Sequence, residues 1–160
     1  MWRCLPHAVE VRDQVYDTLQ RDVALYQQAG CTVICCGDFN AHVGDLEDRQ
    51  HDPYGQPLLE VCPRGVFHYP VNASGEALVE LCVQTGCVLG TGRSARGTHS
   101  APVEASFERP VASGRIARTR PDHCMLSAHG LAWVAEHTVL SDMIGSDHRP
   151  LSLTVEIPCL

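Results

Sequence analysis

The sequence predicts one domain of the α/β class in which strands outnumber helices. Two segments have apolar residues that recur every three or four positions, which is typical of amphipathic helices. Several short apolar runs rich in β-branched residues are bounded by Gly and Pro, which is typical of strands. At 160 residues the chain suits a single domain that buries roughly 70% of the surface exposed when it is unfolded. We therefore expect residues 1–160 to form one domain, with no internal repeat or interdomain linker.

The first helix is expected over residues 7–29, between Pro6 and Gly30, because Pro favours helix starts and Gly favours helix ends. Its apolar face comprises Val11, Val15, Leu19, Val23 and Tyr26. A second helix is expected from about residue 74 to residue 85, with Gly86 as its C-terminal stop. Between them, residues 41–72 contain many Pro residues and an acidic cluster at 45–48, which indicates a loop-rich region that is either a functional surface or partly disordered.

Strands are expected on both sides of the second helix. The predicted strands cover residues 32–37, 87–90, 122–127, 131–139 and 151–157, and an extended hairpin turns at 112–114. The last strand alternates apolar and polar side chains, so one of its faces should be buried. This order of elements predicts an α/β arrangement with the second helix between strands.

Composition excludes several classes of protein. No stretch of about 18 uncharged apolar residues is present, so the sequence predicts no transmembrane helix and no membrane partner. The first residues contain charges and no apolar core of signal-peptide length, so we expect an intracellular protein of the nucleus or cytoplasm. The nine cysteines are odd in number and irregularly spaced, which favours reduced thiols. The nine histidines lack the paired spacing of structural zinc sites.

A local excess of arginine stands out in a chain whose formal net charge is −7. Residues 93–120 contain two acidic residues and six arginines: Arg93, Arg96, Arg109, Arg115, Arg118 and Arg120. Guanidinium groups bind phosphate oxygens in a bidentate manner, so this stretch is a candidate nucleic-acid-binding segment. The alternative is a solvated hairpin, because the chain uses arginine throughout and contains no lysine.

Polar side chains lie at the ends of three predicted strands. Asp38 and Asn40 follow the strand at 32–37, Asp122 begins the strand at 122–127, and Asp147 with His148 precedes the last strand. If these ends meet, carboxylates could activate water or bind a metal ion, and the imidazole could stabilise developing charge. Each motif taken alone is also compatible with a simple turn, because Asp and Asn side chains often bond to the nearby backbone.

Four segments, in this order, carry a resemblance to a known family. They are GDFNAHVG, NASGEALVELCVQTGCVLGT, RPDHCMLS and GSDHRPLSLTV. Together they resemble the endonuclease/exonuclease/phosphatase family, and most of all the endonuclease domain of non-LTR (LINE-type) retrotransposons. The resemblance covers about residues 9–157. The four segments are also similar to those of apurinic/apyrimidinic endonucleases. It implies a two-sheet α/β sandwich of the DNase I-like type.

The resemblance implies a role for each polar residue. Asp38 would orient or deprotonate the attacking water, and Asn40 would hold the scissile phosphate. Asp147 would contribute to a magnesium site, in which manganese could also serve. His148 would donate a hydrogen bond to a phosphate oxygen, and Asp122 would orient His148.

The resemblance also reveals departures from the family. Family members are longer at the N-terminus, where an Asn and a Glu, the principal metal ligand, precede the first helix. We therefore expect an N-terminally truncated domain, about its C-terminal two-thirds, with weak or absent magnesium binding. Thr98–His99 stands where the family often has Thr-Trp, and Pro121 replaces an aliphatic residue.

The resemblance favours a magnesium-dependent phosphodiesterase that nicks DNA. One alternative is an inactive remnant that at most binds nucleic acid through the arginines. Another keeps the chemistry but acts on RNA or on a phosphoinositide or sphingolipid head group. The expected partner is DNA, with RNA as a second choice, and a longer parent protein could carry a reverse transcriptase.

Overall fold

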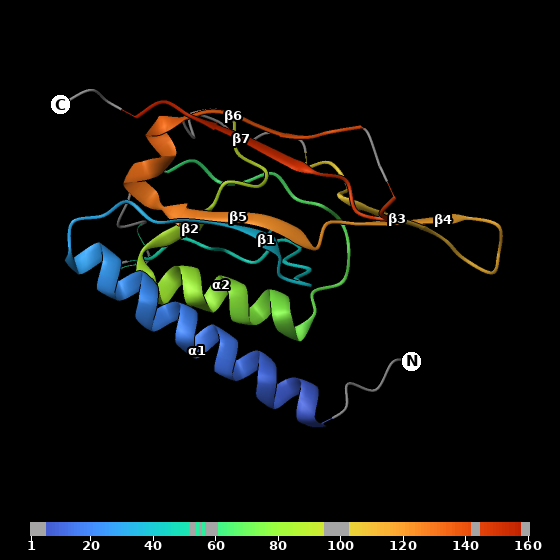
Figure 1. The fold of residues 1–160 in the computed structure, drawn as a ribbon, viewed down its shortest axis with the longest axis horizontal. Coiled ribbons are helices and arrows are strands. Elements are labelled where there is room, and N and C mark those ends of the chain that lie inside the picture. The colour runs from blue at the N-terminus through green and yellow to red at the C-terminus, as the bar shows by residue number, and fades with distance from the viewer. Residues whose placement is uncertain are drawn as a thin grey trace.

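The computed structural model describes residues 6–51, 54, 56, 61–94, 103–141 and 145–157. Helices α1 (Pro6–Gln28) and α2 (Ala73–Thr85) lie on one side of a central sheet, and a two-stranded sheet lies on its other side (Figure 1). The central sheet has the order β1 (Ile34–Asp38), β5 (Asp122–Ser127) and β2 (Cys87–Leu89). The outer sheet pairs β6 (Val134–Val139) with β7 (Leu151–Val155). The prediction of an α/β fold with more strands than helices is confirmed.

Both helices form where the sequence predicts them. The Asn72 side chain accepts the Gly75 N–H at 2.8 Å to cap the start of α2, and Gly86 ends it at a φ of 65°. The predicted apolar face of α1 is only half correct, because Val23 is buried whereas Val11 and Val15 are 45% and 57% exposed. The N-terminal half of the predicted apolar face, at Val11 and Val15, is therefore not covered by the core, whereas Val23 is.

The central sheet is antiparallel, and β5 is its middle strand with every residue buried. Its pairing with β1 runs from Ile34 opposite Leu126 to Asp38 opposite Asp122. The apolar run of β1 thus lies beside that of β5, and this alignment determines the register. As a result, two acidic residues 84 positions apart along the chain face each other at one end of the sheet.

The hairpin of β3 (Phe107–Pro110) and β4 (Ile116–Thr119) projects from the end of the sheet where β5 begins (Figure 1). Its predicted turn is confirmed, and Gly114 supplies the positive φ of 75° that this turn requires. The prediction of a strand over residues 131–139 was wrong only for residues 131–133. A 3-10 helix, η2 (Ala128–Trp133), precedes β6, and Gly130 packs there against Thr32 so closely that a side chain would collide.

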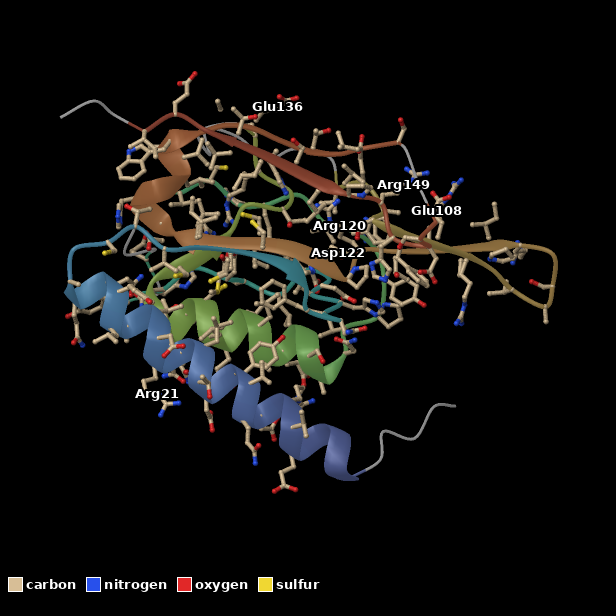
Figure 2. The ribbon with its side chains drawn as sticks, in the orientation of Figure 1. Arg21, Glu108, Arg120, Asp122, Glu136 and Arg149 are labelled. Carbon is tan, nitrogen blue, oxygen red and sulfur yellow. The ribbon has the colours of Figure 1, made fainter. Side chains whose placement is uncertain are left out.

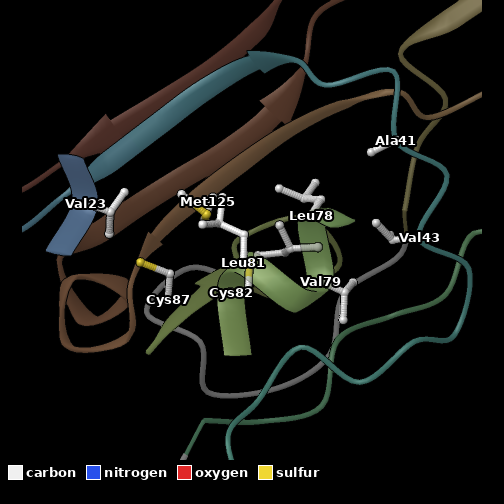
Figure 3. Packing of buried hydrophobic residues seen from close by; sticks show 10 residues of the cluster. Val23, Ala41, Val43, Leu78, Val79, Leu81, Cys82, Cys87 and Met125 are labelled. Carbon is white, nitrogen blue, oxygen red and sulfur yellow. The ribbon is translucent and has the colours of Figure 1, made fainter. Parts of the chain in front are cut away.

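Two apolar cores hold the layers together. The larger lies between the helices and the central sheet (Figure 3), and its buried members are Val23, Ala41, Val43, Leu78, Val79, Leu81, Cys82, Cys87, Leu89 and Met125. The smaller lies between the central sheet and the outer sheet, and its buried members are Val88, Cys124, Leu126, Ala128, Leu131 and Val134. Alternate residues of β5 contribute to the two cores, as expected for a strand that is covered on both faces.

A buried ion pair anchors the loop-rich region that follows β1. The Asp48 carboxylate is 1% exposed and accepts hydrogen bonds from Arg93 at 2.8 and 2.9 Å and from the Leu89 N–H at 2.7 Å. Arg64 donates to the carbonyl oxygens of Gly44 and Leu46, each at 2.8 Å. These bonds connect the predicted loop to β2 and order it despite its lack of regular structure. In the part of the chain described, no helix has the length and apolarity needed to cross a membrane.

Candidate active site

The candidate site lies where β1 ends and β5 begins. Strand pairing places Asp38 opposite Asp122, and the Phe39 N–H donates to the Pro121 carbonyl at 3.1 Å, which extends the pairing by one bond. The Asp38 side chain is 38% exposed, whereas that of Asp122 is 11% exposed. One carboxylate is therefore open to solvent and the other is mostly enclosed.

His148 completes the group from the loop before β7. Its Nδ1 lies 3.0 and 3.2 Å from the two carboxylate oxygens of Asp122, and its Nε2 lies 3.9 Å from Oδ2 of Asp38. A carboxylate can only accept, so Nδ1 carries the hydrogen. The 3.9 Å separation exceeds a hydrogen bond, which leaves Nε2 and Asp38 able to engage a third group.

The start of β3 holds the His148 loop in place. His148 forms an isolated β-bridge with Phe107, and their rings meet edge to face with centroids 4.9 Å apart. On either side, the Glu108 N–H donates to the Asp147 carbonyl at 3.1 Å and the Arg149 N–H donates to the Ser106 carbonyl at 2.6 Å. This short ladder orients the imidazole before any ligand is present.

Ser106 belongs to the site, and the sequence prediction missed it. Its hydroxyl is fully buried and donates to Oδ2 of Asp122 at 2.5 Å. Ser106 precedes an aromatic residue, Phe107, and this pairing of a hydroxyl with a ring was sought instead at Thr98–His99. Those two residues lie outside the described part of the chain.

Asn40 makes local bonds that keep Asp38 in position. Its backbone N–H donates to Oδ1 of Asp38 at 2.8 Å, and its φ is 49°, the left-handed region that Asn tolerates. The Asn72 side chain also donates to the Asn40 carbonyl at 2.9 Å, which joins this turn to the cap of α2. The Asx turn anticipated as the simple interpretation is therefore present, and it coexists with an exposed Asp38 carboxylate.

Buried His123 supports the same turn from beneath. Its Nε2 lies 2.9 Å from the Ala41 carbonyl, so this nitrogen carries the hydrogen, and its Nδ1 lies 3.3 Å from the Thr91 hydroxyl. Burial lowers the pKa of His123 from 6.5 to about 4, because a charged imidazole would lose its hydration. His123 is thus a neutral structural residue that was not predicted from the sequence.

Asp38, Asp122 and His148 are the described residues that could hold a metal ion together. Their ligand atoms all lie within 4.8 Å of one another. Two carboxylates and waters suit a hard divalent cation, and the exposed Asp38 oxygens could reach one without breaking the bonds of Asp122. Asp147, the predicted metal ligand, is exposed and stands outside this group, while its backbone pairs with Glu108. The donor set therefore fits a divalent cation centred on Asp38.

The predicted arginine segment divides into buried and exposed members. Arg93 is bound to Asp48, and Arg120 donates to the backbone carbonyls of Asp122 at 2.8 Å and Glu104 at 2.9 Å. Burial lowers the pKa of Arg120 to about 10. The prediction that these two arginines contact phosphate is corrected, because their guanidinium groups are engaged inside the protein. Arg96 lies outside the described residues.

The exposed arginines lie on the β3–β4 hairpin beside the site. Arg109, Arg115 and Arg118 are exposed, and Arg118 pairs with Glu108 at 3.1 Å while remaining 62% exposed. Figure 2 shows Glu108 and Arg149 close to Asp122, at the end of the sheet from which the hairpin leaves. Asp38 and Asn40 also line a groove of about 1020 Å³ between α1 and β1. The site is thus open toward both the hairpin and the groove.

Comparison with known proteins gives a structural match only. No family model matches the chain, and no curated protein matches it. Among solved structures, the 3'-5' exonuclease (NExo) from Neisseria meningitidis is similar at a TM-score of 0.60 and 15% sequence identity. The match covers 96% of this chain and 56% of the exonuclease chain, so the chain spans about half the length of that structure. The chain therefore has a mixed α/β fold found in a nuclease structure.

Proposed function

We propose that this chain is a nuclease-type phosphodiesterase domain that hydrolyses a backbone phosphate of nucleic acid. The observation that carries the proposal is the hydrogen-bonded pair of Asp122 and His148 directed toward the open carboxylate of Asp38. The fold match to an exonuclease supports the same reaction class. More finely, the domain is a DNase I-like sandwich of the endonuclease/exonuclease/phosphatase family, akin to LINE-type endonucleases that nick DNA.

Each side chain has a separate task in this reaction. Asp38 orients the attacking water and accepts its proton, since its carboxylate is exposed beside the imidazole. Asp122 fixes the Nδ1–H of His148, which directs Nε2 away from Asp122. In its charged form, His148 donates the Nε2–H to a phosphate oxygen as negative charge develops there. The side-chain amide of Asn40 holds a second phosphate oxygen.

A divalent cation, magnesium or manganese, completes the proposed site. Asp38 is the ligand that we favour, because it is the exposed carboxylate of the metal-capable group. Asp147, which lies outside that group, would have to be recruited from the neighbouring loop as a second carboxylate. When bound, the cation supplies Lewis-acid neutralisation of the phosphate. The protein groups prepare this chemistry by holding two carboxylates and an imidazole together.

The exposed hairpin arginines would bind the polyanion on either side of the scissile phosphate. Arg115 and Arg118 are accessible and lie on an arm that leaves the protein next to the site. Such contacts recognise backbone charge and carry no base specificity of their own. We propose DNA as the substrate, and RNA is the alternative substrate to be compared with it.

The test is nicking of supercoiled plasmid by the purified chain with added Mg²⁺ or Mn²⁺. We expect the wild-type chain to nick, EDTA to stop the reaction, and His148→Ala to reduce the rate by at least about 100-fold. His51→Ala is the matched control, because His51 is exposed on the loop after β1, outside the metal-capable group. Equal rates for wild type and His148→Ala would contradict the proposal.

A second candidate is a domain that binds nucleic acid and does not cleave it. The observation that favours it is the composition of the metal-capable group, which holds no glutamate among the described residues. In that case the hairpin arginines would still give salt-dependent DNA binding. Metal-dependent nicking separates the two candidates directly.

A further inference from the structure

Two cysteines lie directly opposite each other in the central sheet. The pairing of β1 with β5 places Cys36 directly across from Cys124. The chain places no other described cysteine opposite a cysteine in a strand register, because Cys35 faces Met125 and Cys87 faces Ser127. All the described cysteines are free thiols in this structure.

The geometry of this pair suits a disulfide. Opposite residues of an antiparallel ladder have Cβ atoms about 4.5–5.5 Å apart. A disulfide needs Cβ atoms about 3.5–4.5 Å apart, so only a small closing movement is required. Because Cys36 and Cys124 are directly opposite in the antiparallel ladder, their side chains lie next to each other on the same face of the sheet.

The two thiols differ sharply in accessibility. Cys36 is exposed at the edge of the sheet, whereas Cys124 is fully buried in the core under the outer sheet. A reagent from solvent can therefore reach Cys36 but cannot reach Cys124. This combination of one accessible thiol and one shielded thiol resembles the chemistry of an attacking and a resolving cysteine.

We propose that Cys36 and Cys124 form a reversible redox modification site, closed by exchange with a small-molecule disulfide such as oxidised glutathione. The Cys36 thiol loses its proton, and the thiolate attacks one sulfur of glutathione disulfide to form a mixed disulfide. The first glutathione leaves and takes up the proton that Cys36 lost. The Cys124 thiol then attacks the Cys36 sulfur and breaks the mixed disulfide, and the departing second glutathione takes up the Cys124 proton. Two protein thiols lose two electrons, and one glutathione disulfide is reduced to two thiols.

The position of this pair places the modification beside the candidate active site. Residues two apart on a strand lie on one face, so the Cys36–Cys124 pair shares a face with Asp38 and Asp122. A bond between these cysteines would link β1 to β5 next to the two carboxylates. The redox chemistry itself does not depend on the proposed phosphodiesterase activity.

The test equilibrates the full 160-residue chain with mixtures of reduced and oxidised glutathione. The mixtures are quenched in acid, free thiols are labelled with N-ethylmaleimide in denaturant, and the intact mass is measured. We expect two thiols to be lost together without retained glutathione, with fragments that join residues 36 and 124. Dithiothreitol restores both thiols, and the oxidised form melts at a higher temperature.

Three variants identify the participants. Cys124→Ala should stop at a stable glutathione adduct on Cys36, and in Cys36→Ala the remaining thiol, Cys124, should stay reduced. Cys35→Ser is the matched control from the adjacent position on the opposite face, and it should behave as wild type. Because Cys36 is exposed, its variant tests the proposal even if Cys124→Ala does not fold. A wild-type glutathione adduct that never resolves, or bonds among other cysteines, would overturn the proposal.

Discussion

At the scale of single residues, Asp122 is where the contacts of the site converge. It accepts from the Ser106 hydroxyl and from Nδ1 of His148, and its carbonyl accepts from Arg120. A buried carboxylate needs such donors, because an unpaired charge in this position would be strongly destabilising. Its partners therefore determine both where Asp122 points and where it holds the imidazole.

Ser106→Ala removes one of these donors without touching the solvent-exposed groups. We expect the nicking rate to fall about 10-fold, because residues that orient an active-site group typically contribute this much. Ser106→Thr keeps the hydroxyl and should retain most activity. The measurement is the initial nicking rate at saturating plasmid, with thermal melting to confirm folding.

Ser113→Ala, in the exposed turn of the hairpin, is the matched control for loss of a hydroxyl. A Ser106→Ala protein that nicks as fast as wild type would show that Asp122 keeps its position without Ser106.

Sequence reasoning predicted the convergence of Asp38, Asp122 and His148, and the structure brings these three together. It missed Ser106 and His123, since their contribution depends on neighbours distant in sequence. Ser106 matters through a bond to a residue 16 positions away, and His123 through a carbonyl 82 positions away. Such pairs arise from strand register and loop packing, which local patterns do not specify.

At the scale of elements, the β3–β4 hairpin is the segment most exposed to a polyanion. Its arginines were predicted as part of a longer basic segment, but Arg93 and Arg120 turned inward. The difference is physical, because Arg93 pairs with Asp48 and Arg120 donates to backbone carbonyls inside the protein, whereas Arg115 and Arg118 are exposed on the hairpin. Net charge along a sequence cannot distinguish these environments.

Arg115→Ala and Arg118→Ala should each weaken DNA binding and reduce the slope of log affinity against log salt by about one unit. Each replaced arginine removes roughly one phosphate contact and the release of its counterion. The measurement is fluorescence anisotropy with a labelled DNA duplex over a series of salt concentrations.

Arg21→Ala is the control, because Arg21 is exposed on α1, away from the hairpin (Figure 2). Slopes that are unchanged in both hairpin variants would remove the hairpin from the proposed DNA-binding surface.

The limits of helices were predicted from the sequence more accurately than the packing between elements. The predicted limits of α2 are correct within one residue, because Gly86 was recognised as its C-terminal stop, whereas the Asn72 cap at its start was not predicted. By contrast, η2 replaced the start of a predicted strand, and its Gly130 packs so closely against Thr32 that a side chain there would collide. That constraint comes from a distant segment of the chain and leaves no local periodicity.

At the scale of the whole molecule, two histidines tie stability to pH. His123 and His137 are held by burial at pKa values of about 4, below the usual 6.5. Between these values the unfolded chain binds protons that the folded chain does not. Stability is therefore fully present above about pH 6.5 and falls as the pH drops toward about 4.

His123→Gln should flatten this dependence. One histidine that titrates only in the unfolded state contributes a slope of up to about 1.4 kcal/mol per pH unit. We expect the variant to be less stable at neutral pH, because the bond to Ala41 is disturbed, but to lose less stability on acidification. Urea unfolding across this pH range measures the slope.

His51→Gln provides the comparison, because His51 is exposed. If His123→Gln retained the full wild-type slope, the neutral buried state of His123 would be refuted.

The measurement that tests the central claim most directly is a double-mutant cycle of plasmid nicking with Asp122→Asn and His148→Ala. If Asp122 acts by orienting His148, each variant alone should lose nearly as much rate as the double variant. The account predicts this lack of additivity in metal-containing buffer, with all three proteins folded. Losses that multiply in the double variant, or an Asp122→Asn protein with full turnover, would contradict it.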